Sequence, residues 1–482
     1  MTRSRADNSK APRPIPVRRY RYSKLRWRIG VRALDAVGSC LTWCWRRFRA
    51  RPKVESPRRI LVAQLDHLGD AVLSSPLFPK LQNAYPDATI DVLASPSNRA
   101  IFEADPRVDR VIVAERSWFE RRPGRKATAT AVWELGKSLR ARRYDLGIDV
   151  RGDVLTVLVL ALARIPRRLG WAMGGGGFLL TDVAPWVPDR HEVVARLALL
   201  EPLGIVANDT EEPPRVVVHL CDRDRARIAK LLRDAWPSAP HAGYFFNDFR
   251  SHGSSPQTQI EGRRQWKVSA SRASRNASKT LAAARRLSQT DDSASDSDDP
   301  ETLHAGRFGD DAPLLAAHLG AGTPAKRWPS RHWRDLIGRF LAEGWRVAIV
   351  GGSEDLNIVE GLPPHPNLRD WTGRLAVTET AALLERADLF IGADSAPAHL
   401  AACAGTPSVV LFSGTNRVRQ WRPWSRRSLV LKRRVSCSPC HRKVCPLADH
   451  PCLSGLSPDR VQRAARRLWM LSLRSEASGG PR

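Results

Sequence analysis

The chain has 482 residues, of which 42% are hydrophobic and 26% charged, a balance that excludes a wholly disordered or fibrous protein and suggests roughly two to four domains. Its net charge of +29 is concentrated at the two ends, because residues 1–59 carry +15 and residues 415–482 carry +13. The nearly neutral middle argues against a uniformly basic nucleic-acid binder and favours an enzyme body with basic attachments to an anionic surface. No run of about 18 uncharged apolar residues occurs, so no transmembrane helix is predicted.

Residues 1–58 form a basic extension that begins with a polar, proline-rich stretch, which we expect to be disordered. An amphipathic helix is predicted over residues 23–50, where apolar residues recur at near-helical spacing among arginines, and Trp27, Trp43 and Trp45 add interfacial aromatics. This helix can lie in a membrane interface, or it can pack on the body of the protein. No signal peptide is visible, so we expect a cytoplasmic, reducing location.

Residues 59–210 alternate short apolar strands with helices, which predicts a parallel, doubly wound sheet. The predicted strands are at residues 59–65, 89–94, 108–113 and 144–149, and the predicted helices are at residues 71–84 and 133–142. Residues 211–236 are interpreted as a linker or helix.

Residues 237–312 interrupt this pattern and are interpreted as a disordered insertion. Residues 250–286 contain nine basic and one acidic residue, whereas residues 291–301 contain six acidic and no basic residues. The two halves could pair with each other, but no chemistry is indicated there.

Residues 313–456 repeat the alternation and predict a second Rossmann-like domain. The predicted strands are at residues 314–319, 345–350, 389–391 and 408–412, and the predicted helices are at residues 333–343, 377–386 and 396–404. A final helix is predicted over residues 457–471, within a C-terminal helix and tail at residues 457–482.

Ligands of open α/β sheets bind at the carboxyl ends of the strands, and the first candidate motif follows the first strand. Residues 66–70 read Asp-His-Leu-Gly-Asp. Gly69 permits a tight turn, and Asp70 stands at the start of the next helix, where a carboxylate is a favourable N-cap. The same carboxylate, if it faces a cleft, could take a proton from an attacking hydroxyl.

The second candidate motif is residues 320–329, Gly-Ala-Gly-Thr-Pro-Ala-Lys-Arg-Trp-Pro. Its glycines let backbone approach an anion, Thr323 can hydrogen-bond to phosphate oxygens, and Lys326 supplies a positive charge. Its spacing excludes a Walker P-loop and weakens a dinucleotide interpretation. Glu354 could accept hydrogen bonds from ribose hydroxyls, or it could be a solvated acid at a helix start.

The third candidate motif, residues 392–402, also follows a strand, and Pro397 suits the first turn of the next helix. Free backbone amides near Ser395 and Ala396 form an anion site, with the helix dipole behind them. His399 lies about one turn further along, near the same ligand.

The segment 437–452 is rich in cysteine. Four thiolates there could hold a tetrahedral structural zinc, with two histidines as alternative ligands, or they could remain reduced structural cysteines. The four cysteines are Cys437, Cys440, Cys445 and Cys452, and the two histidines are His441 and His450.

Taken together, these motifs resemble glycosyltransferase family nine, the ADP-heptose:lipopolysaccharide heptosyltransferases. The resemblance runs from residue 59 to about residue 471, without the insertion, and is carried by residues 60–76, 144–153, 168–170, 191–192, 326–329 and 394–399 and by the cysteine-rich tail. It implies a GT-B fold, in which two Rossmann-like domains face each other across a cleft, and inverting transfer without a cofactor or catalytic metal.

The resemblance also implies roles for single residues. Asp70 is the expected general base on the acceptor hydroxyl, and the remaining matches are donor contacts: Thr323 and Lys326 to the diphosphate, Glu354 to ribose, Asp394 to the sugar, and Ser395, Ala396 and His399 at the phosphate-binding helix start. The expected reaction moves heptose from ADP-heptose onto a lipopolysaccharide-core or related glycolipid. The enzyme is expected to associate peripherally with the anionic inner face of the cytoplasmic membrane, without binding nucleic acid.

Two departures from the family pattern keep further interpretations open. Ala396 stands where the family commonly has glycine, and Gln64 holds a position that is often basic, so another nucleotide sugar could be the donor. The chain could also be a non-catalytic sugar-nucleotide binder or scaffold, or a protein that binds an anionic surface or nucleic acid. The joint presence of Asp70, Lys326 and the 394–399 motif argues against a non-catalytic protein.

Overall fold

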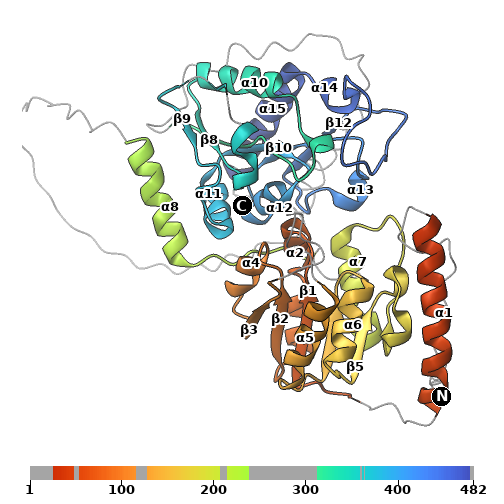
Figure 1. Ribbon diagram of the computed structural model, residues 1–482. Helices are drawn as coiled ribbons and strands as arrows, with labels where there is room; N and C mark the ends of the chain where they lie inside the picture. The colour runs from red at the N-terminus through yellow and green to blue at the C-terminus, as the bar shows by residue number, and fades with distance from the viewer. Residues whose placement is uncertain are drawn as a thin grey trace, which may run out of the picture.

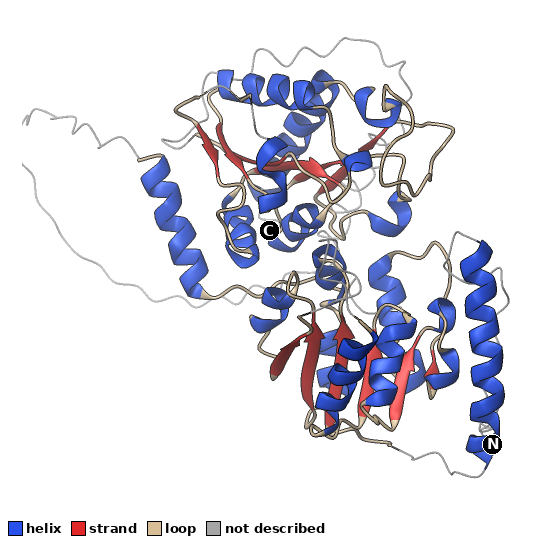
Figure 2. Cartoon of the chain, viewed as in Figure 1, coloured by secondary structure: helices blue, strands red, loops and turns tan. Residues whose placement is uncertain are grey.

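The computed structural model describes residues 25–47, 54–115, 128–206, 214–237, 312–358, 361–362 and 364–477. These residues form two lobes, each built around a six-stranded sheet with helices on its faces (Figures 1 and 2). The predicted insertion, apart from its two end residues, and the start of the N-terminal extension lie outside the described residues. None of the helices in the described ranges is long and apolar enough to cross a membrane.

The sheet of the first lobe is entirely parallel, with strand order β3-β2-β1-β4-β5-β6. Alternate residues of its central strand enter different cores: Ile60 and Val62 face one side, and Leu61 and Ala63 face the other. The apolar run of this strand is therefore explained by burial on both faces. The strands are β1 (Arg59–Gln64), β2 (Thr89–Ala94), β3 (Arg110–Val113), β4 (Leu146–Asp149), β5 (Arg167–Gly170) and β6 (Asp182–Val183).

The helix predicted over residues 71–84 is broken into two, because Pro76 lacks the N–H that would continue the hydrogen-bond ladder and becomes the N-cap of the second piece. The amphipathic helix predicted near the N-terminus is confirmed as α1, which runs along the outside of the first lobe (Figure 1). The α-helices of this lobe are α1 (Leu25–Arg47), α2 (Leu68–Ser74), α3 (Leu77–Ala84), α4 (Arg99–Glu103), α5 (Ala129–Arg140), α6 (Val154–Leu162) and α7 (Glu192–Ala198).

The sheet of the second lobe is also entirely parallel, with strand order β12-β11-β10-β7-β8-β9. Its strands are β7 (Leu314–His318), β8 (Arg346–Ile349), β9 (Leu368–Asp370), β10 (Leu389–Ala393), β11 (Ser408–Phe412) and β12 (Ser428–Lys432). Its α-helices are α8 (Asp222–Ala235), α10 (Ser330–Ala342), α11 (Val377–Arg386), α12 (Ala396–Ala404), α13 (Val418–Trp421), α14 (Pro451–Ser454) and α15 (Pro458–Ala477).

The two sheets share one topology, since counting strands from the start of each lobe gives the order 3-2-1-4-5-6 in both. This is the doubly wound Rossmann order, in which ligands bind where the strand order reverses. The reversal lies between β1 and β4 in the first lobe and between β7 and β10 in the second. The fold class predicted from the sequence is confirmed, and all three candidate motifs follow strands at these reversals.

Helix α8, predicted as part of a linker, packs on α11 within the second lobe through the ion pairs Arg225–Glu385 and Arg227–Glu379 (Figure 1). The lobes themselves are joined by a hydrophobic cluster that contains Val72 of α2 as well as side chains of α12.

Candidate active site

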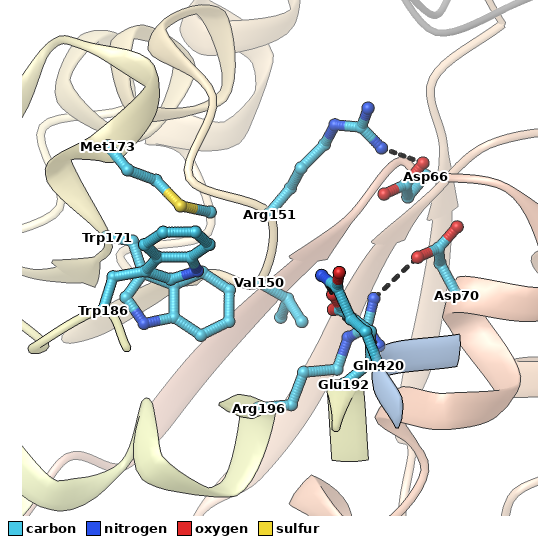
Figure 3. A pocket seen from close by; sticks show the side chains of 10 residues that line it. All are labelled: Asp66, Asp70, Val150, Arg151, Trp171, Met173, Trp186, Glu192, Arg196 and Gln420. Carbon is cyan, nitrogen blue, oxygen red and sulfur yellow. Dashed lines mark hydrogen bonds and ion pairs between the residues drawn. The ribbon is translucent and has the colours of Figure 1, made fainter. Parts of the chain in front are cut away.

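A pocket lies at the carboxyl ends of β1 and β4 (Figure 3). Carboxylates and arginines line one side, and two tryptophans and a methionine line the other. The space among its lining atoms is about 340 Å³, a figure that includes open solvent. Gln420, from the second lobe, also lines it, so the pocket is at the junction of the lobes.

Ion pairs hold the two aspartates of the pocket. Arg196 donates from Nη2 to Oδ1 of Asp70 at 2.8 Å, and the two residues are only 3% and 9% exposed. Arg151, which follows β4, pairs with Asp66. A buried charge needs such a partner because it has lost its water. Burial lowers the pKa of Arg196, but the carboxylates of Glu192 and the two aspartates raise it above its ordinary value, so Arg196 remains charged.

The structure corrects the local prediction for Asp70. Helix α2 begins at Leu68 with His67 as its N-cap, so Asp70 is the third helical residue and its carboxylate points to Arg196 instead of capping the helix. Gly69 is likewise inside the helix, and its φ is not positive, so it does not form the expected tight turn. Its role is close approach to the second lobe.

The opposite wall of the pocket consists of Trp171, Trp186 and Met173, whose side chains lie together across from the two aspartates (Figure 3). Trp171 and Met173 are each 3% exposed. Aromatic faces opposite polar groups suit a sugar ring, which has apolar C–H faces and polar hydroxyl edges. The sequence motifs did not identify this wall.

In the second lobe, the structure brings together four of the residues predicted to contact the nucleotide-sugar donor. Lys326 donates from Nζ to Oδ2 of Asp394 at 2.7 Å and to its backbone oxygen at 3.1 Å. Asn416 donates to the same carboxylate oxygen at 2.8 Å. Ser395 follows as the N-cap of α12, with Ala396 as the first helical residue. Lysine, aspartate and helix start therefore converge at the carboxyl end of β10.

A buried chain of hydrogen bonds supports this helix start. Ser395 Oγ lies 3.0 Å from His318 Nδ1, and His318 Nε2 lies 3.1 Å from Asp355 Oδ2. Burial raises the pKa of Asp355, but its hydrogen bond and charge interaction with His318 hold the pKa below its ordinary value. Sequence reasoning selected Glu354, which is exposed, and missed the buried Asp355 next to it. Gly320 leaves room for this carboxylate, because an added Cβ there would lie only 1.9 Å from Oδ1 of Asp355.

Thr323 is half-buried and starts the short 3₁₀ turn η6 (Pro324–Lys326). Its backbone oxygen accepts from the Lys326 amide at 3.0 Å, so the turn fixes the lysine relative to the threonine. Both residues of the second motif are thus on one turn after β7.

His399 lies at the junction of the lobes. It is 5% exposed, and a Cβ added to Gly69 would lie 3.1 Å from its Cδ2 atom. Burial lowers the pKa of His399 to about 4; Asp394 opposes this shift, while Lys326 and Arg196 reinforce it. The structure packs the His399 ring against the helix that carries Asp70, and its predicted place beside the phosphate stays a prediction.

A second histidine also connects the lobes. His191, the N-cap of α7, accepts at Nδ1 from the Val193 amide at 3.2 Å, so its protonated Nε2 donates to the Arg422 backbone oxygen at 2.8 Å. Burial is the main cause that lowers the pKa of His191 to about 4. Nearby, Gln420 donates to Glu192 at 2.7 Å.

The four clustered cysteines differ in their surroundings: Cys437 is exposed and Cys452 is buried, and burial raises the pKa of the Cys452 thiol. Within the described ranges, no group of three or more histidine, cysteine, aspartate or glutamate side chains is placed to hold a metal ion. This geometry gives no support to a zinc ion at the cluster, which stays a prediction.

Comparison of the sequence with known proteins finds relatives that are all described as heptosyltransferases. A model of glycosyltransferase family 9 (heptosyltransferase) matches residues 263–450. Lipopolysaccharide heptosyltransferase 2 of Escherichia coli strain K12 is 23% identical over 420 residues, which cover 84% of this chain and 96% of that protein. Lipopolysaccharide heptosyltransferase 3 of Escherichia coli is 24% identical over 370 residues, which cover 74% of this chain and 84% of that protein.

Solved structures show the same fold. The E. coli ADP-heptose lipopolysaccharide heptosyltransferase II superposes with a TM-score of 0.59 at 20% identity, covering 86% of this chain and 99% of that one. E. coli heptosyltransferase WaaC with ADP superposes with a TM-score of 0.51 at 15% identity, covering 85% of this chain and 99% of that one.

Two Rossmann-like lobes that meet at a carboxylate-lined pocket give the chain a fold of the GT-B type. The sequence relatives all point in one direction. The chain is similar to glycosyltransferase family 9, whose model matches residues 263–450, and to lipopolysaccharide heptosyltransferases over most of its length.

Proposed function

We propose that the protein transfers heptose from ADP-heptose onto a lipopolysaccharide-core or related glycolipid, with inversion at the anomeric carbon. One observation carries the proposal: Gly69 lies against Ala396 and His399, so the helix that bears Asp70 touches the start of α12. A proton acceptor and an anion site that belong to different lobes are thus held next to each other, as a transfer reaction requires.

On the donor side, the backbone amides at the start of α12 and Lys326 would hold the diphosphate. As the bond between the anomeric carbon and the diphosphate oxygen breaks, negative charge grows on the leaving ADP, and preorganised donors stabilise that charge. Lys326 is paired with Asp394 in the structure, so donor binding exchanges part of this ion pair for contacts to phosphate and sugar. Thr323 and Glu354 are the further proposed contacts, to phosphate and ribose.

On the acceptor side, the hydroxyl oxygen attacks the anomeric carbon from the face opposite the leaving group, and its proton passes to the carboxylate of Asp70. Oδ1 of Asp70 is held by Arg196, which fixes the carboxylate at the pocket. The Trp171 and Trp186 wall would pack on the acceptor sugar. No cofactor takes part in this scheme, since Lys326 and the helix amides supply the positive charge.

The donor is tested by a thermal-shift panel of nucleotide sugars with the full chain, followed by mass spectrometry of the product glycan. We expect ADP-heptose to give the largest stabilisation and a product heavier by one heptose. Stabilisation by a different nucleotide sugar would identify that compound as the donor in place of ADP-heptose. Binding without any product would identify a non-catalytic binder. A salt-sensitive shift of DNA without sugar-nucleotide binding would overturn the proposal altogether.

The proposed location is the inner, anionic face of the cytoplasmic membrane, where such an acceptor is made. Residues 1–59 carry a net charge of +15, and each nearby basic residue contributes about 1 kcal/mol at an anionic leaflet. Deletion of residues 1–57 should abolish co-sedimentation with anionic liposomes and leave ADP binding intact, since β1 starts at Arg59. The proposed location is wrong if the full chain ignores anionic liposomes at low salt.

A further inference from the structure

Helix α1 has an inner face that is built into the first lobe. Among the α1 residues whose burial the structure describes, the buried ones are Val31, Asp35 and Gly38, spaced about one turn apart. Oδ1 of Asp35 accepts a hydrogen bond from the Gly176 amide at 2.7 Å, and Asp35 is 5% exposed. Asp35 is also the single acidic residue of α1, so the one negatively charged side chain of the helix lies on its inner face.

The inner face contacts a loop of four consecutive glycines, residues 174–177. There is no room for side chains in this contact: a Cβ on Gly175 would lie 2.5 Å from Val31, and one on Gly38 would lie 2.5 Å from the Phe178 ring. On its other side the loop is equally close, since a Cβ on Gly174 would lie 1.8 Å from the backbone oxygen of Gly152. The glycine loop is therefore clamped between α1 and the turn that follows β4.

This clamped loop is continuous with the aromatic wall of the pocket. Trp171 and Met173 directly precede it in the chain, and both line the pocket (Figure 3). The Gly152 turn touches both of them, because a Cβ on Gly152 would lie 3.1 Å from Cβ of Trp171 and 3.3 Å from Cε of Met173. Close-packed layers transmit displacement, so the position of the wall depends on how α1 sits on the loop.

The outer face of α1 has a different character. It exposes Leu25, Ile29, Leu34, Val37 and Leu41, which are between 47% and 70% exposed. Leu34, Val37 and Leu41 have the i, i+3, i+7 spacing of a single stripe. The helix also carries five arginines, and its one carboxylate faces inward. Apolar side chains with cations and no competing outward acid suit the surface of an anionic bilayer.

We propose that α1 couples an anionic lipid surface to the acceptor pocket: its outer face binds the bilayer, and its inner face sets the Trp171 and Met173 wall through the glycine loop. The acceptor part of this inference rests on the proposed function, whereas the coupling of α1 to the loop does not. A tether alone would act only on location, but α1 acts on the shape of the site as well.

The inner contact is tested by a matched pair of substitutions at Asp35. Asp35→Leu removes the acceptor for the Gly176 amide, while Asp35→Asn keeps a carbonyl oxygen that can accept the same hydrogen bond. In amide hydrogen exchange of the full chain, Asp35→Leu should speed exchange across residues 171–180, and Asp35→Asn should stay near wild type. In transfer assays, Asp35→Leu should raise the KM for acceptor roughly tenfold and leave ADP affinity unchanged.

A loss of ADP binding in Asp35→Leu would indicate global misfolding, and the decision then falls to the vesicle experiment with the wild-type chain. Wild-type exchange rates in residues 171–180 of a folded Asp35→Leu variant would overturn the inference.

The outer contact is tested with vesicles of phosphatidylethanolamine and phosphatidylglycerol, against vesicles of phosphatidylcholine alone. The anionic vesicles should slow amide exchange in residues 171–180 of the wild-type chain, and the zwitterionic vesicles should not. The triple variant Leu34→Gln/Val37→Gln/Leu41→Gln should lose this response while keeping the wild-type exchange pattern without vesicles. Wild-type protein that sediments with anionic vesicles without any change at residues 171–180 would show that α1 is only a tether. Because hydrogen exchange needs no sugar donor, this result stands even if heptose transfer is not the reaction.

Discussion

The two lobes have the same strand order but compensate the charges at their strand reversals differently. In the second lobe, Lys326 is neutralised by Asp394, and both belong to motifs visible in the sequence. In the first lobe, Asp66 is paired in the same way with Arg151 across the reversal, but Asp70 is neutralised by Arg196, which is 126 residues away on α7. One topology therefore supports a site made from its own strand ends and another that depends on a distant helix. The difference shows that a shared fold fixes where a site lies, but not which residues complete it.

The first test of the difference between the two lobes is a substitution of Asp70. Asp70→Asn should lower turnover by ~10²–10⁴-fold, the usual range for loss of a general base, and should keep the affinity for ADP. Steady-state transfer and calorimetry measure the two effects. Asp182→Asn is the matched control, because Asp182 also pairs with an arginine, at 3.2 Å from Arg167, but does not line the pocket. Near-normal turnover in Asp70→Asn would remove Asp70 from the proposed role.

The dependence of the first lobe on α7 is tested at Arg196. Arg196→Gln leaves the Asp70 carboxylate without its buried partner, and breaking such a pair costs about 3–5 kcal/mol. Denaturant unfolding should show this loss, together with reduced turnover. The control Arg167→Gln breaks a more exposed pair and should cost less. Equal losses of stability in the two variants would mean that the Asp70–Arg196 pair contributes no more to the first lobe than the Arg167–Asp182 pair does.

The second lobe is tested at Lys326. Lys326→Ala should weaken the binding of ADP and of ADP-sugar alike, by roughly 10–100-fold, because the lost charge-assisted contact is to phosphate. Calorimetry with both ligands measures this, and Lys137→Ala on α5 of the first lobe is the control. Unchanged ADP affinity would contradict the assignment of Lys326 to the diphosphate.

The junction between the lobes should respond to pH. His191 and His399 each have a folded-state pKa near 4, against 6.5 as the ordinary value, so below pH 6.5 the unfolded chain binds more protons than the folded one. Stability should therefore fall as the pH drops from about 6.5 toward 4, by an amount of the order of 1–3 kcal/mol. Thermal unfolding across this window measures the slope. His191→Gln should flatten it, and an unaltered slope in that variant would exclude His191 as a source.

Sequence patterns were sufficient where local physics decides the structure. Strands β2 and β11 and helices α11 and α12 have the predicted bounds, because apolar runs and capping signals lie within each segment. The region from α6 to α7 was not resolved from the sequence. Helix α6 is apolar on nearly every face, so it lacks the polar stripe that identifies an amphipathic helix.

The candidate site was predicted only in part for a related reason. Lys326, Asp394 and Ser395 are close in space because they follow paired strands, and that order can be deduced from alternation alone. Arg196 and Asp355 can be recognised only in the folded structure, because no residue near them in the sequence indicates which side chains they contact. The i, i+4 pair of Glu192 and Arg196 was the available hint, but a pair of this kind is more often a solvated helix contact.

Gly69 determines how closely α2 of the first lobe approaches α12 of the second. Its hydrogen side chain is what allows α2 to rest against the His399 ring, where a methyl group would stand 3.1 Å from Cδ2 and 3.6 Å from Cα of Ala396. A methyl group there would be closer than ordinary van der Waals contact, so the His399 ring or the helix that bears Asp70 would have to shift by a few tenths of an ångström. Displacements of about 1 Å are enough to slow reactions that depend on alignment. The glycine of the first motif is thus a spacer of minimum width, which sets how closely the helix that bears Asp70 approaches the start of α12.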